Sequence, residues 1–359
     1  MQYKILHIIP YITSKYGGPP YVVKSLNKFF NKNNFNSQIL TLCNKNKNDN
    51  NIKCFKLTTK YFWFSFDFMF NSIKYIKNCD IIFIHGIYSF TSLWGSIIGK
   101  IFNKKILLLP HGMLDKDSIN SSNIFKNIIR KIFLYTIGLI IIKFANKIIF
   151  NSQKEKENSI FSKNSIVIPN GVDVEYIGSI KCNKKYFAYN KISLFFLGRI
   201  HPIKGIELLV DAINILDDNM KNKIEVVIAG NGDMQYIKYL QKKSDKCIKF
   251  IGHIEGDEKY CYLKQCDIYL QPSQTEGLSI SMLEAMACKV NMITTNKVGL
   301  YEELVKNNAA KIINYDVKEL KEAIFDIITN RLDFKEKGFE LIKEKYNWNM
   351  IVKEYKKLI

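Results

Sequence analysis

The sequence predicts an α/β protein made of two Rossmann-like, doubly wound domains that face each other across a cleft. The chain has 359 residues, whereas a single hydrophobic core seldom grows beyond roughly 250 to 300 residues, so two domains are expected. Hydrophobic residues make up 47% of the chain, which is enough for two cores. In both halves, short apolar runs alternate with longer helical stretches, as in parallel sheets with helical crossovers.

The first half contains the strands and helices of one such domain. Strands are expected where short runs of apolar or β-branched residues lie between turn signals, and helices where longer amphipathic stretches join them. Strands are predicted at residues 4–10, 37–43, 80–85, 105–109, 147–151 and 165–168, and helices near residues 21–30, 89–101 and 125–144.

The second half repeats the alternation. A helix is predicted at residues 207–216, a linker at 175–190 and a single final helix at 334–358. The active site is expected at the carboxyl ends of both sheets, where open α/β sheets bind their ligands. Strands are predicted at residues 194–198, 225–229, 248–250, 268–271, 290–294 and 310–313.

Residues 276–284 contain two carboxylates, Glu276 in a glycine-containing loop and Glu284 inside a predicted helix. Ser281 lies three residues before Glu284, which is the spacing of a capping box, so the helix is expected to begin near residues 279–281. The free N–H groups of that helix start would favour an anion. Glu276 could then bind sugar hydroxyls and Glu284 a ribose diol. The structural alternative is a plain loop glutamate followed by a capping glutamate.

A second cluster, Gly198, Arg199 and Lys204, directly follows a predicted buried strand and precedes a helix. Arginine can grip phosphate oxygens as a fork, while lysine acts as a mobile point charge. A single arginine or lysine at this place would be interpreted as an ordinary exposed surface residue. Two cations in one strand-to-helix turn, upstream of the carboxylate pair, indicate a diphosphate site.

These residues make the sequence resemble the retaining glycosyltransferases of family 4, which have the two-domain B fold. The resemblance extends over nearly the whole chain in the expected order. Its matching residues are Tyr16-Gly17-Gly18, Pro110-His111-Gly112, Pro169-Asn170-Gly171-Val172-Asp173, Gly198, Arg199, Lys204, Gly205, Ala229-Gly230-Asn231-Gly232, and the run from Glu276 to Glu284 followed by Ala285-Met286-Ala287.

The resemblance implies a role for each matching residue. The expected domains are residues 1–172, residues 173–340, and a final segment, residues 341–359, that crosses back onto the first domain. The catalytic residues implied are His111, Glu276, Arg199 and Lys204. The donor-binding residues implied are Gly17, Gly18, Gly198, Arg199, Lys204, Glu276, Gly277, Leu278, Ser279 and Glu284.

The remaining histidines and cysteines are weaker signals. His85 ends a predicted strand and is a candidate for acceptor binding, whereas His7 lies within a strand and is expected to be structural. His201 and His253 could line the donor site. The eight cysteines include no Cys-x-x-Cys pair, so a reduced cytosolic protein is expected.

No cofactor is expected, because the nucleotide-sugar is a substrate, and no metal is expected either. Asp115 and Asp117 have the spacing of the Asp-x-Asp metal motif found in the other major glycosyltransferase fold. Here Arg199 and Lys204 would neutralise the diphosphate without a metal. We therefore interpret both aspartates as loop residues, with Asp115 a candidate acceptor contact.

Positive charge is concentrated in the first half. Residues 1–170 contain 24 Lys/Arg and 7 Asp/Glu, and the remaining residues contain 29 and 26. Residues 61–70 are rich in aromatic side chains and residues 132–142 are an apolar run flanked by cations. Each segment could be core or could insert into an anionic membrane surface. No motif for nucleic-acid binding accompanies the charge, so no nucleic acid partner is expected.

The expected function is metal-independent, retaining transfer of a sugar from a nucleotide-diphosphate sugar, UDP favoured over GDP, to a glycan acceptor. The acceptor is expected to be lipid-linked, in surface polysaccharide or lipopolysaccharide synthesis, and the enzyme cytoplasmic and peripheral at the inner face of the membrane. The alternatives are a phosphorylase or an epimerase on the same fold, or a protein that binds nucleic acid or another anionic surface without catalysis.

Overall fold

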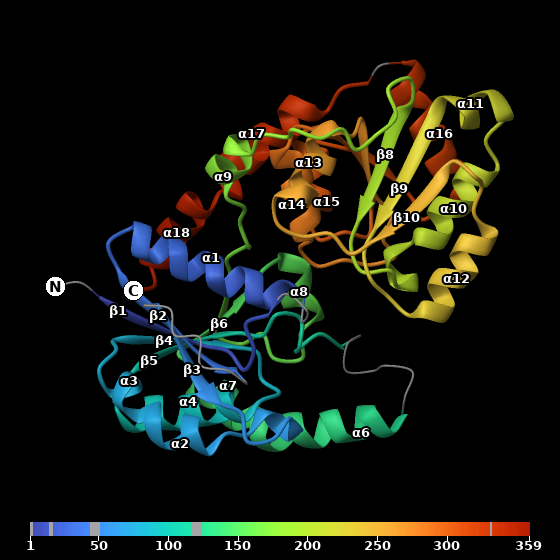
Figure 1. Ribbon diagram of the computed structural model, residues 1–359. Coiled ribbons are helices and arrows are strands. Elements are labelled where there is room, and N and C mark those ends of the chain that lie inside the picture. The colour runs from blue at the N-terminus through green and yellow to red at the C-terminus, as the bar shows by residue number, and fades with distance from the viewer. Residues whose placement is uncertain (1–2, 14–16, 44–50, 117–123, 331) are drawn as a thin grey trace. The chain divides into compact units, whose positions relative to one another are not determined.

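The computed structural model describes residues 3–13, 17–43, 51–116, 124–330 and 332–359 (Figure 1). The chain divides into two compact units. Unit 1 contains Met1–Asn170 and Trp348–Ile359, and unit 2 contains Gly171–Asn347. Each unit is built around its own parallel sheet.

Within the described residues, the sheet of unit 1 has seven strands in the order β3-β2-β1-β4-β5-β6-β7. The order reverses between β1 and β4, which makes the carboxyl ends of these two strands the switch point where such sheets bind ligands. The strands are β1 (Lys4–Ile8), β2 (Asn36–Cys43), β3 (Ile52–Lys56), β4 (Ile81–His85), β5 (Lys105–Leu109), β6 (Lys147–Phe150) and β7 (Ser165–Val167).

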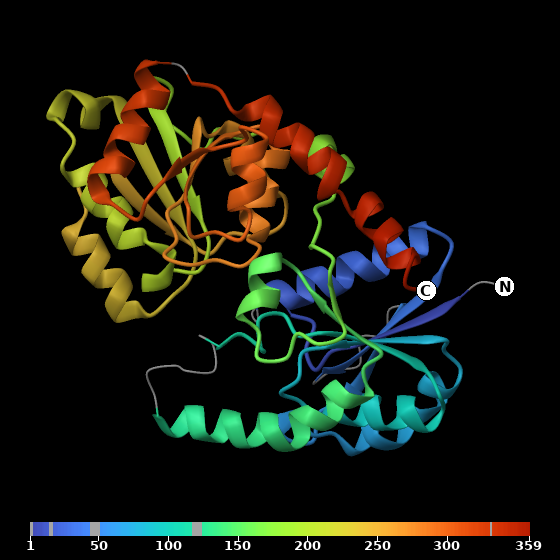
Figure 2. The same ribbon diagram turned by 180° about the vertical axis from the view of Figure 1, so that it is seen from behind.

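Helices cover both faces of this sheet (Figure 1). On one face, α1 (Gly18–Lys32) packs beside α18 (Trp348–Lys356), where the rings of Phe30 and Tyr355 lie 5.8 Å apart (Figure 2). The other face carries α4 (Phe90–Ile101), whose glycines allow close contact with the strands. The remaining helices of unit 1 are η2 (Tyr61–Trp63), α2 (Phe66–Asn71), α3 (Ile73–Lys77), α6 (Ile124–Phe133), the π-helical turn η3 (Leu134–Gly138), α7 (Leu139–Phe144) and α8 (Gln153–Asn158).

The described sheet of unit 2 has six strands in the order β10-β9-β8-β11-β12-β13, so its switch point lies between β8 and β11. The strands are β8 (Ile192–Leu197), β9 (Ile224–Ala229), β10 (Ile248–Gly252), β11 (Ile268–Gln271), β12 (Asn291–Thr295) and β13 (Lys311–Ile313). The helices are α9 (Val174–Ser179), η4 (Pro202–Lys204), α10 (Ile206–Asn214), α11 (Asp218–Lys223), α12 (Met234–Lys243), α13 (Asp257–Gln265), α14 (Ile280–Ala287), α15 (Tyr301–Lys306), α16 (Val317–Thr329) and α17 (Lys335–Lys345).

The prediction of two doubly wound sheets is confirmed, and the predicted strands agree with the observed ones to within a few residues. Strand β3 was not predicted. The prediction of one final helix at residues 334–358 is wrong, because the chain forms α17 in unit 2 and α18 in unit 1. Between them the carbonyl of Tyr346 accepts a hydrogen bond from the N–H of Val172 at 2.8 Å, which interrupts the helix.

The expectation that all cysteines are unpaired is wrong for Cys182 and Cys261, which form a disulfide. The two cysteines are 79 residues apart in the sequence, so no local spacing could indicate the pairing. The disulfide ties the segment predicted as a linker to α13. That segment also contains the short helix α9.

Candidate functional site

The turn after β8 brings a lysine to the switch point of unit 2. Gly205 follows η4 in the left-handed region, with φ 69°, and a Cβ there would clash with the carbonyl oxygen of Pro272 just beyond β11. Glycine therefore allows the turn to lie directly against the end of the neighbouring strand. This contact places Lys204 beside the loop that carries Glu276.

Lys204 and Glu276 form an ion pair, with side chains 18% and 15% exposed. Two of the three predicted catalytic residues of this unit are therefore paired with each other. Arg199 is exposed, and its guanidinium has no hydrogen bond or ion pair with any residue that the structure describes. The pKa of the nearby His201 is lowered by burial, then by the charges of Arg199 and Lys204. Positive charge thus gathers in this turn.

The loop after Glu276 leads into α14, with Ser279 at the N-cap. The N–H of Gly299 donates to the carbonyls of Glu276 and Gly277, at 2.9 and 3.0 Å, and the buried Leu278 anchors the loop in the core. Within the described part of the chain, no side chain caps the first turn of α14. The predicted helix start is confirmed, and its N–H groups stay available for an anion.

The capping-box interpretation of Ser281 and Glu284 is wrong. The carboxylate of Glu284 is 2% exposed and points to α13. Its Oε1 accepts hydrogen bonds from Lys259 Nζ at 2.6 Å and Tyr260 OH at 2.9 Å. These two donors lie far away in the sequence, so the local spacing was misleading.

In unit 1, Gly17 and Gly18 lie at the start of α1, with Gly17 at φ 84°. Both glycines are exposed, and a Cβ at either position would meet no described atom within 4 Å. The first turn of α1 contains two prolines and no acidic residue. Among the described residues, none blocks an anionic ligand from approaching the backbone at this helix start.

The predicted catalytic residue His111 follows β5 in a strained turn. Its φ is 51° and that of Gly112 is 79°, so two consecutive residues lie in the left-handed region. Glu155 holds this turn: its carboxylate accepts hydrogen bonds from the N–H groups of Gly112 at 2.6 Å and Asn151 at 2.9 Å. The sequence interpretation missed Glu155. Its spacing from Ser152, the N-cap of α8, was a signal that could have drawn attention to it.

Three histidine rings form a hydrogen-bonded chain behind this turn. His85 Nδ1 lies 2.9 Å from His111 Nε2, and His85 Nε2 lies 3.0 Å from His7 Nδ1. His85 is buried, and both of its ring nitrogens contact another histidine. This arrangement leaves His85 no free ring nitrogen for the acceptor hydroxyl that the sequence interpretation assigned to it.

The Asp-x-Asp motif falls partly outside the described residues, because Asp117 is not among them. Asp115 accepts a hydrogen bond from Asn158 Nδ2 at 2.7 Å, and its backbone forms a bridge with Ser159. In the described ranges no group of three or more His, Cys, Asp or Glu side chains could hold a metal ion. The assignment of Asp115 to acceptor binding stays a prediction.

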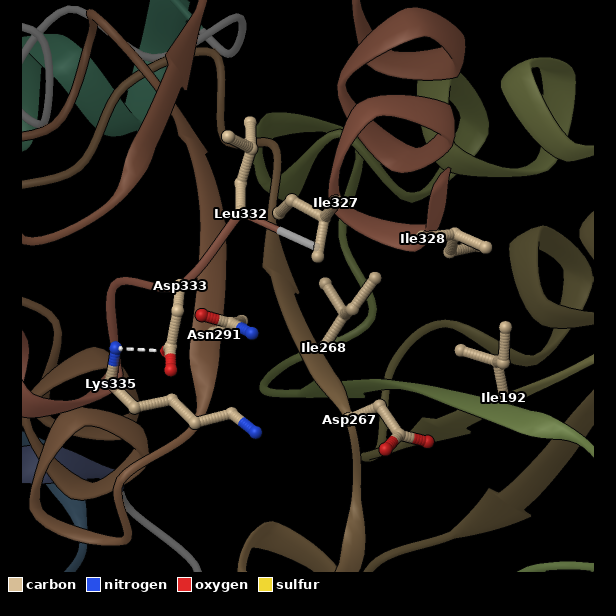
Figure 3. Close-up of a pocket in the computed structure, with 9 residues that line it drawn as sticks. All are labelled: Ile192, Asp267, Ile268, Asn291, Ile327, Ile328, Leu332, Asp333 and Lys335. Carbon is tan, nitrogen blue, oxygen red and sulfur yellow. Dashed lines mark hydrogen bonds between the residues drawn. The ribbon is translucent and has the colours of Figure 1, made fainter. Parts of the chain in front are cut away.

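Figure 3 shows a pocket at the opposite edge of the unit 2 sheet. It lies at the amino ends of β8, β11 and β12, near Ile192, Ile268 and Asn291. The N–H of Lys335 donates to Asp333 at 3.0 Å on its rim. None of the predicted site residues lines this pocket.

The aromatic segment at residues 61–70 and the apolar run at residues 132–142 are each partly core and partly surface. Phe68, Leu134 and Ile141 are buried in the core. The rings of Phe62 and Phe133 lie 5.2 Å apart and join the two segments. We call the exposed apolar side chains of the two segments, together with those of residues 128 and 129 just before the second, the apolar patch: Tyr61, Phe66, Phe70, Ile128, Ile129, Ile132, Tyr135 and Ile140. No helix among the described residues is long and apolar enough to cross a membrane.

Residues 16–176 match the family model described as Glycosyltransferase Family 4, and residues 182–348 match the model described as Glycosyl transferases group 1. The chain is 29% identical over 323 residues to an uncharacterized glycosyltransferase of Methanocaldococcus jannaschii, covering 86% of this chain and 78% of that protein. It is 24% identical over 296 residues to the O-antigen biosynthesis glycosyltransferase WclY of Escherichia coli, covering 79% of each chain.

Among solved structures, Anabaena HepE in complex with UDP has a TM-score of 0.75 at 14% sequence identity, over 99% of each chain. At this identity the likeness shows a common fold, with two Rossmann-like sheets. The two family models together extend from residue 16 to residue 348 and meet within the short segment between the sheets. The chain therefore belongs to the family 4 type of glycosyltransferases with the two-domain B fold, and it is a glycosyltransferase enzyme.

Proposed function

We propose that the enzyme transfers a sugar, with retention of configuration and without a metal, from a nucleotide-diphosphate sugar to a lipid-linked glycan acceptor. The observation that carries this proposal is the turn after β8, where Lys204 is paired with Glu276 and Arg199 is exposed at the switch point of the sheet. Two cations there can stabilise the charge that develops on a departing diphosphate. Glu276, released from Lys204, then binds sugar hydroxyls.

UDP is the nucleotide we favour, and surface polysaccharide or lipopolysaccharide synthesis is the expected context. HepE, which has the same fold, was solved in complex with UDP and with UDP-glucose. Two relatives are named for O-antigen and capsular polysaccharide biosynthesis, WclY and the Staphylococcus aureus protein CapH. Because the resemblance offers no nucleophilic carboxylate for a double displacement, attack from the leaving-group face is the mechanism proposed for retention.

Thermal shift of the full-length protein with UDP, GDP and their sugar conjugates tests the donor assignment. A ligand at 100 times its Kd stabilises the folded state by about 2.7 kcal/mol. UDP compounds should stabilise the protein, and Lys204→Ala should lose most of that shift. Lys289→Ala is the matched control, because Lys289 forms a surface ion pair with Glu336 in the same unit. If no nucleotide stabilises the wild type, or if Lys204→Ala responds as the wild type does, the diphosphate site is wrong.

A membrane surface is the partner we propose for unit 1. The apolar patch provides side chains for insertion, with Ile129 and Phe70 67% and 65% exposed. The excess of 24 Lys/Arg over 7 Asp/Glu in residues 1–170 provides attraction to anionic lipid. Each basic residue near such a surface contributes about 1 kcal/mol, and this attraction weakens as salt is added. Such binding would bring the enzyme to a lipid-linked acceptor.

Flotation of the full-length protein with phosphatidylglycerol vesicles tests the membrane proposal. Binding is expected at low salt, with a salt-resistant fraction that Ile129→Ser reduces. Ile215→Ser is the control, because Ile215 is a comparably apolar and 47% exposed side chain of unit 2. A wild type that does not float, or that binds DNA more strongly than vesicles in a parallel filter assay, would overturn the proposal.

A further inference from the structure

The carboxylate of Glu284 is buried in unit 2 with only one of its two oxygens bonded. Its side chain is 2% exposed. Oε1 accepts hydrogen bonds from Lys259 Nζ at 2.6 Å and from Tyr260 OH at 2.9 Å, whereas no described residue donates a hydrogen bond to Oε2. A buried acceptor without a protein donor is unusual and calls for another partner. The side chain of Lys259 is 19% exposed, so the ion pair reaches the surface of the unit.

The two donors hold Oε1 from two sides. Lys259 and Tyr260 are consecutive residues of α13, and consecutive side chains of a helix point in directions about 100° apart. The two side chains nevertheless converge on one oxygen, and Lys259 Nζ also lies over the Tyr260 ring, 4.6 Å from its centroid. Two donors from one rigid helix fix the orientation of the Glu284 carboxylate, because turning it would break both hydrogen bonds.

Helix α13 is itself tied to the segment that leads into the unit. Cys261, the residue after these two donors, forms the disulfide with Cys182. One turn further along, Lys264 Nζ donates to the carbonyl of Ile180 at 2.8 Å. The helix is thus anchored covalently and by a hydrogen bond, and it provides a fixed support for the donors.

The held carboxylate lies on the helix that begins at the predicted donor site. Ser279, at the N-cap of α14, follows the loop that carries Glu276. Glu284 comes five residues after Ser279, which corresponds to about 7.5 Å along the helix axis. A diphosphate at the start of α14 and a ribose beside Glu284 therefore fit within one nucleotide.

We infer that Lys259 and Tyr260 are positioning residues that hold Glu284 through Oε1, so that Oε2 accepts hydrogen bonds from the ribose hydroxyls of the donor. The inference rests on the proposed function, which supplies the nucleotide. A ribose offers two hydroxyl donors, and a deoxyribose lacks one of them. Because Oε2 cannot turn to another donor while Oε1 is held, the two α13 side chains determine how strongly the enzyme prefers ribose to deoxyribose.

Calorimetric titration of the full-length protein with UDP, 2′-deoxy-UDP and 3′-deoxy-UDP measures this preference. At least one of the deoxy compounds should bind about 10- to 100-fold more weakly than UDP, because it leaves a charged acceptor without its hydrogen bond. Equal Kd values for the three nucleotides in the wild type overturn the inference.

The Lys259→Met variant keeps the apolar stem of the lysine and removes its charged donor. The ratio of the deoxy-UDP Kd to the UDP Kd should fall by about tenfold, because the carboxylate can then turn or take up a proton. Tyr260→Phe should lower the ratio less, and Lys259→Arg should restore most of it. Lys264→Met is the matched control on the same helix, and it should leave the ratio unchanged because Lys264 bonds backbone carbonyls rather than Glu284.

The ratio separates positioning from a merely structural role. It compares two ligands on the same folded protein, so a loss of stability alone does not change it. An unchanged ratio in Lys259→Met overturns the inference, and Tyr260→Phe decides in the same way if Lys259→Met does not fold. A wild type that does not bind UDP contradicts the donor assignment and the inference with it. UDP binding without discrimination against the deoxy compounds contradicts the inference alone.

Discussion

In unit 2 the two predicted site carboxylates form ion pairs with lysines. In unit 1 the predicted site residue His111 is a neutral ring that is hydrogen bonded to another neutral histidine ring. Glu276 pairs with Lys204, and Glu284 is bonded by Lys259. His111 is hydrogen bonded to His85, and the turn that carries it is held by a buried glutamate. An ion pair can be exchanged for a charged ligand, but a buried neutral chain cannot take up charge without cost. Unit 2 therefore offers charges that a charged ligand can engage, whereas unit 1 offers neutral hydrogen-bonding rings.

The largest effect should come from the cations of unit 2. Lys204→Ala and Arg199→Ala should each lower turnover about 10²- to 10³-fold, because each removes a charge that stabilises the departing diphosphate. Their denaturation midpoints should stay close to that of the wild type. Steady-state kinetics with an active donor measures the effect, and Lys289→Ala serves as the control. Near-normal turnover in either variant would contradict the prediction that this turn stabilises the charge of the departing diphosphate.

The next effect concerns pH and unit 1. Burial lowers the folded-state pKa of His7 to about 3 and that of His111 to about 4, from unfolded values near 6.5. Between these values the unfolded chain binds more protons than the folded one. The stability is therefore complete above about pH 6.5 and decreases as the pH falls, by about 1.4 kcal/mol per pH unit for His7 alone.

Urea denaturation of the wild type and His7→Leu, at several values between about pH 7 and pH 4.5, measures this slope. The free energy of unfolding of the variant should depend less steeply on pH, because the contribution of His7 is gone. Equal slopes for the two proteins would mean that His7 is not held neutral in the folded state.

A smaller effect is expected at Glu155. Glu155→Gln keeps one acceptor oxygen but places an NH₂ group against a backbone N–H, so the variant should lose about 1–3 kcal/mol of stability. Glu157→Gln is the matched control on the same helix, because Glu157 is exposed and bonds only Gln153 among the described residues. Equal stability of the two variants would show that the turn at His111 does not depend on Glu155.

The smallest effect should follow removal of divalent metal. Chelator-treated enzyme should keep most of its activity, since Arg199 and Lys204 provide the positive charge. Activity assays with and without EDTA measure this. Complete loss of activity, restored by Mn²⁺ or Mg²⁺, would reopen the question of Asp115 and Asp117 as metal ligands.

Most strand positions could be predicted because the strands contain short apolar runs, and the bounds of β5 and β11 were predicted to the residue. Strand β3 was missed because its sequence, Ile-Lys-Cys-Phe-Lys, is interrupted by two lysines and lies at the edge of the sheet. The break between α17 and α18 was missed because the amphipathic pattern continues across it. Its cause, the hydrogen bond from Val172, comes from a distant part of the chain.

The site shows the same limit. Motifs identified the candidate residues Lys204, Glu276 and His111, because their spacing is local to one turn or loop. The contacts that orient them join elements far apart in the sequence: Lys204 pairs with Glu276 across 72 residues, and His85 reaches His111 across 26. Local spacing contains no information about such pairs.

The division of the chain has a consequence for synthesis and folding. Unit 2, Gly171–Asn347, is one continuous segment, whereas unit 1 is interrupted and recovers α18 only at the end of the chain. Until Trp348 and Tyr355 emerge from the ribosome, Phe29 and Phe30 of α1 lack the aromatic partners that cover them. Unit 1 therefore cannot complete its fold until the residues of α18 are available, although most of it is translated first. A fragment ending near residue 170 should expose this aromatic surface and aggregate, and a fragment of unit 2 should be the one that folds alone.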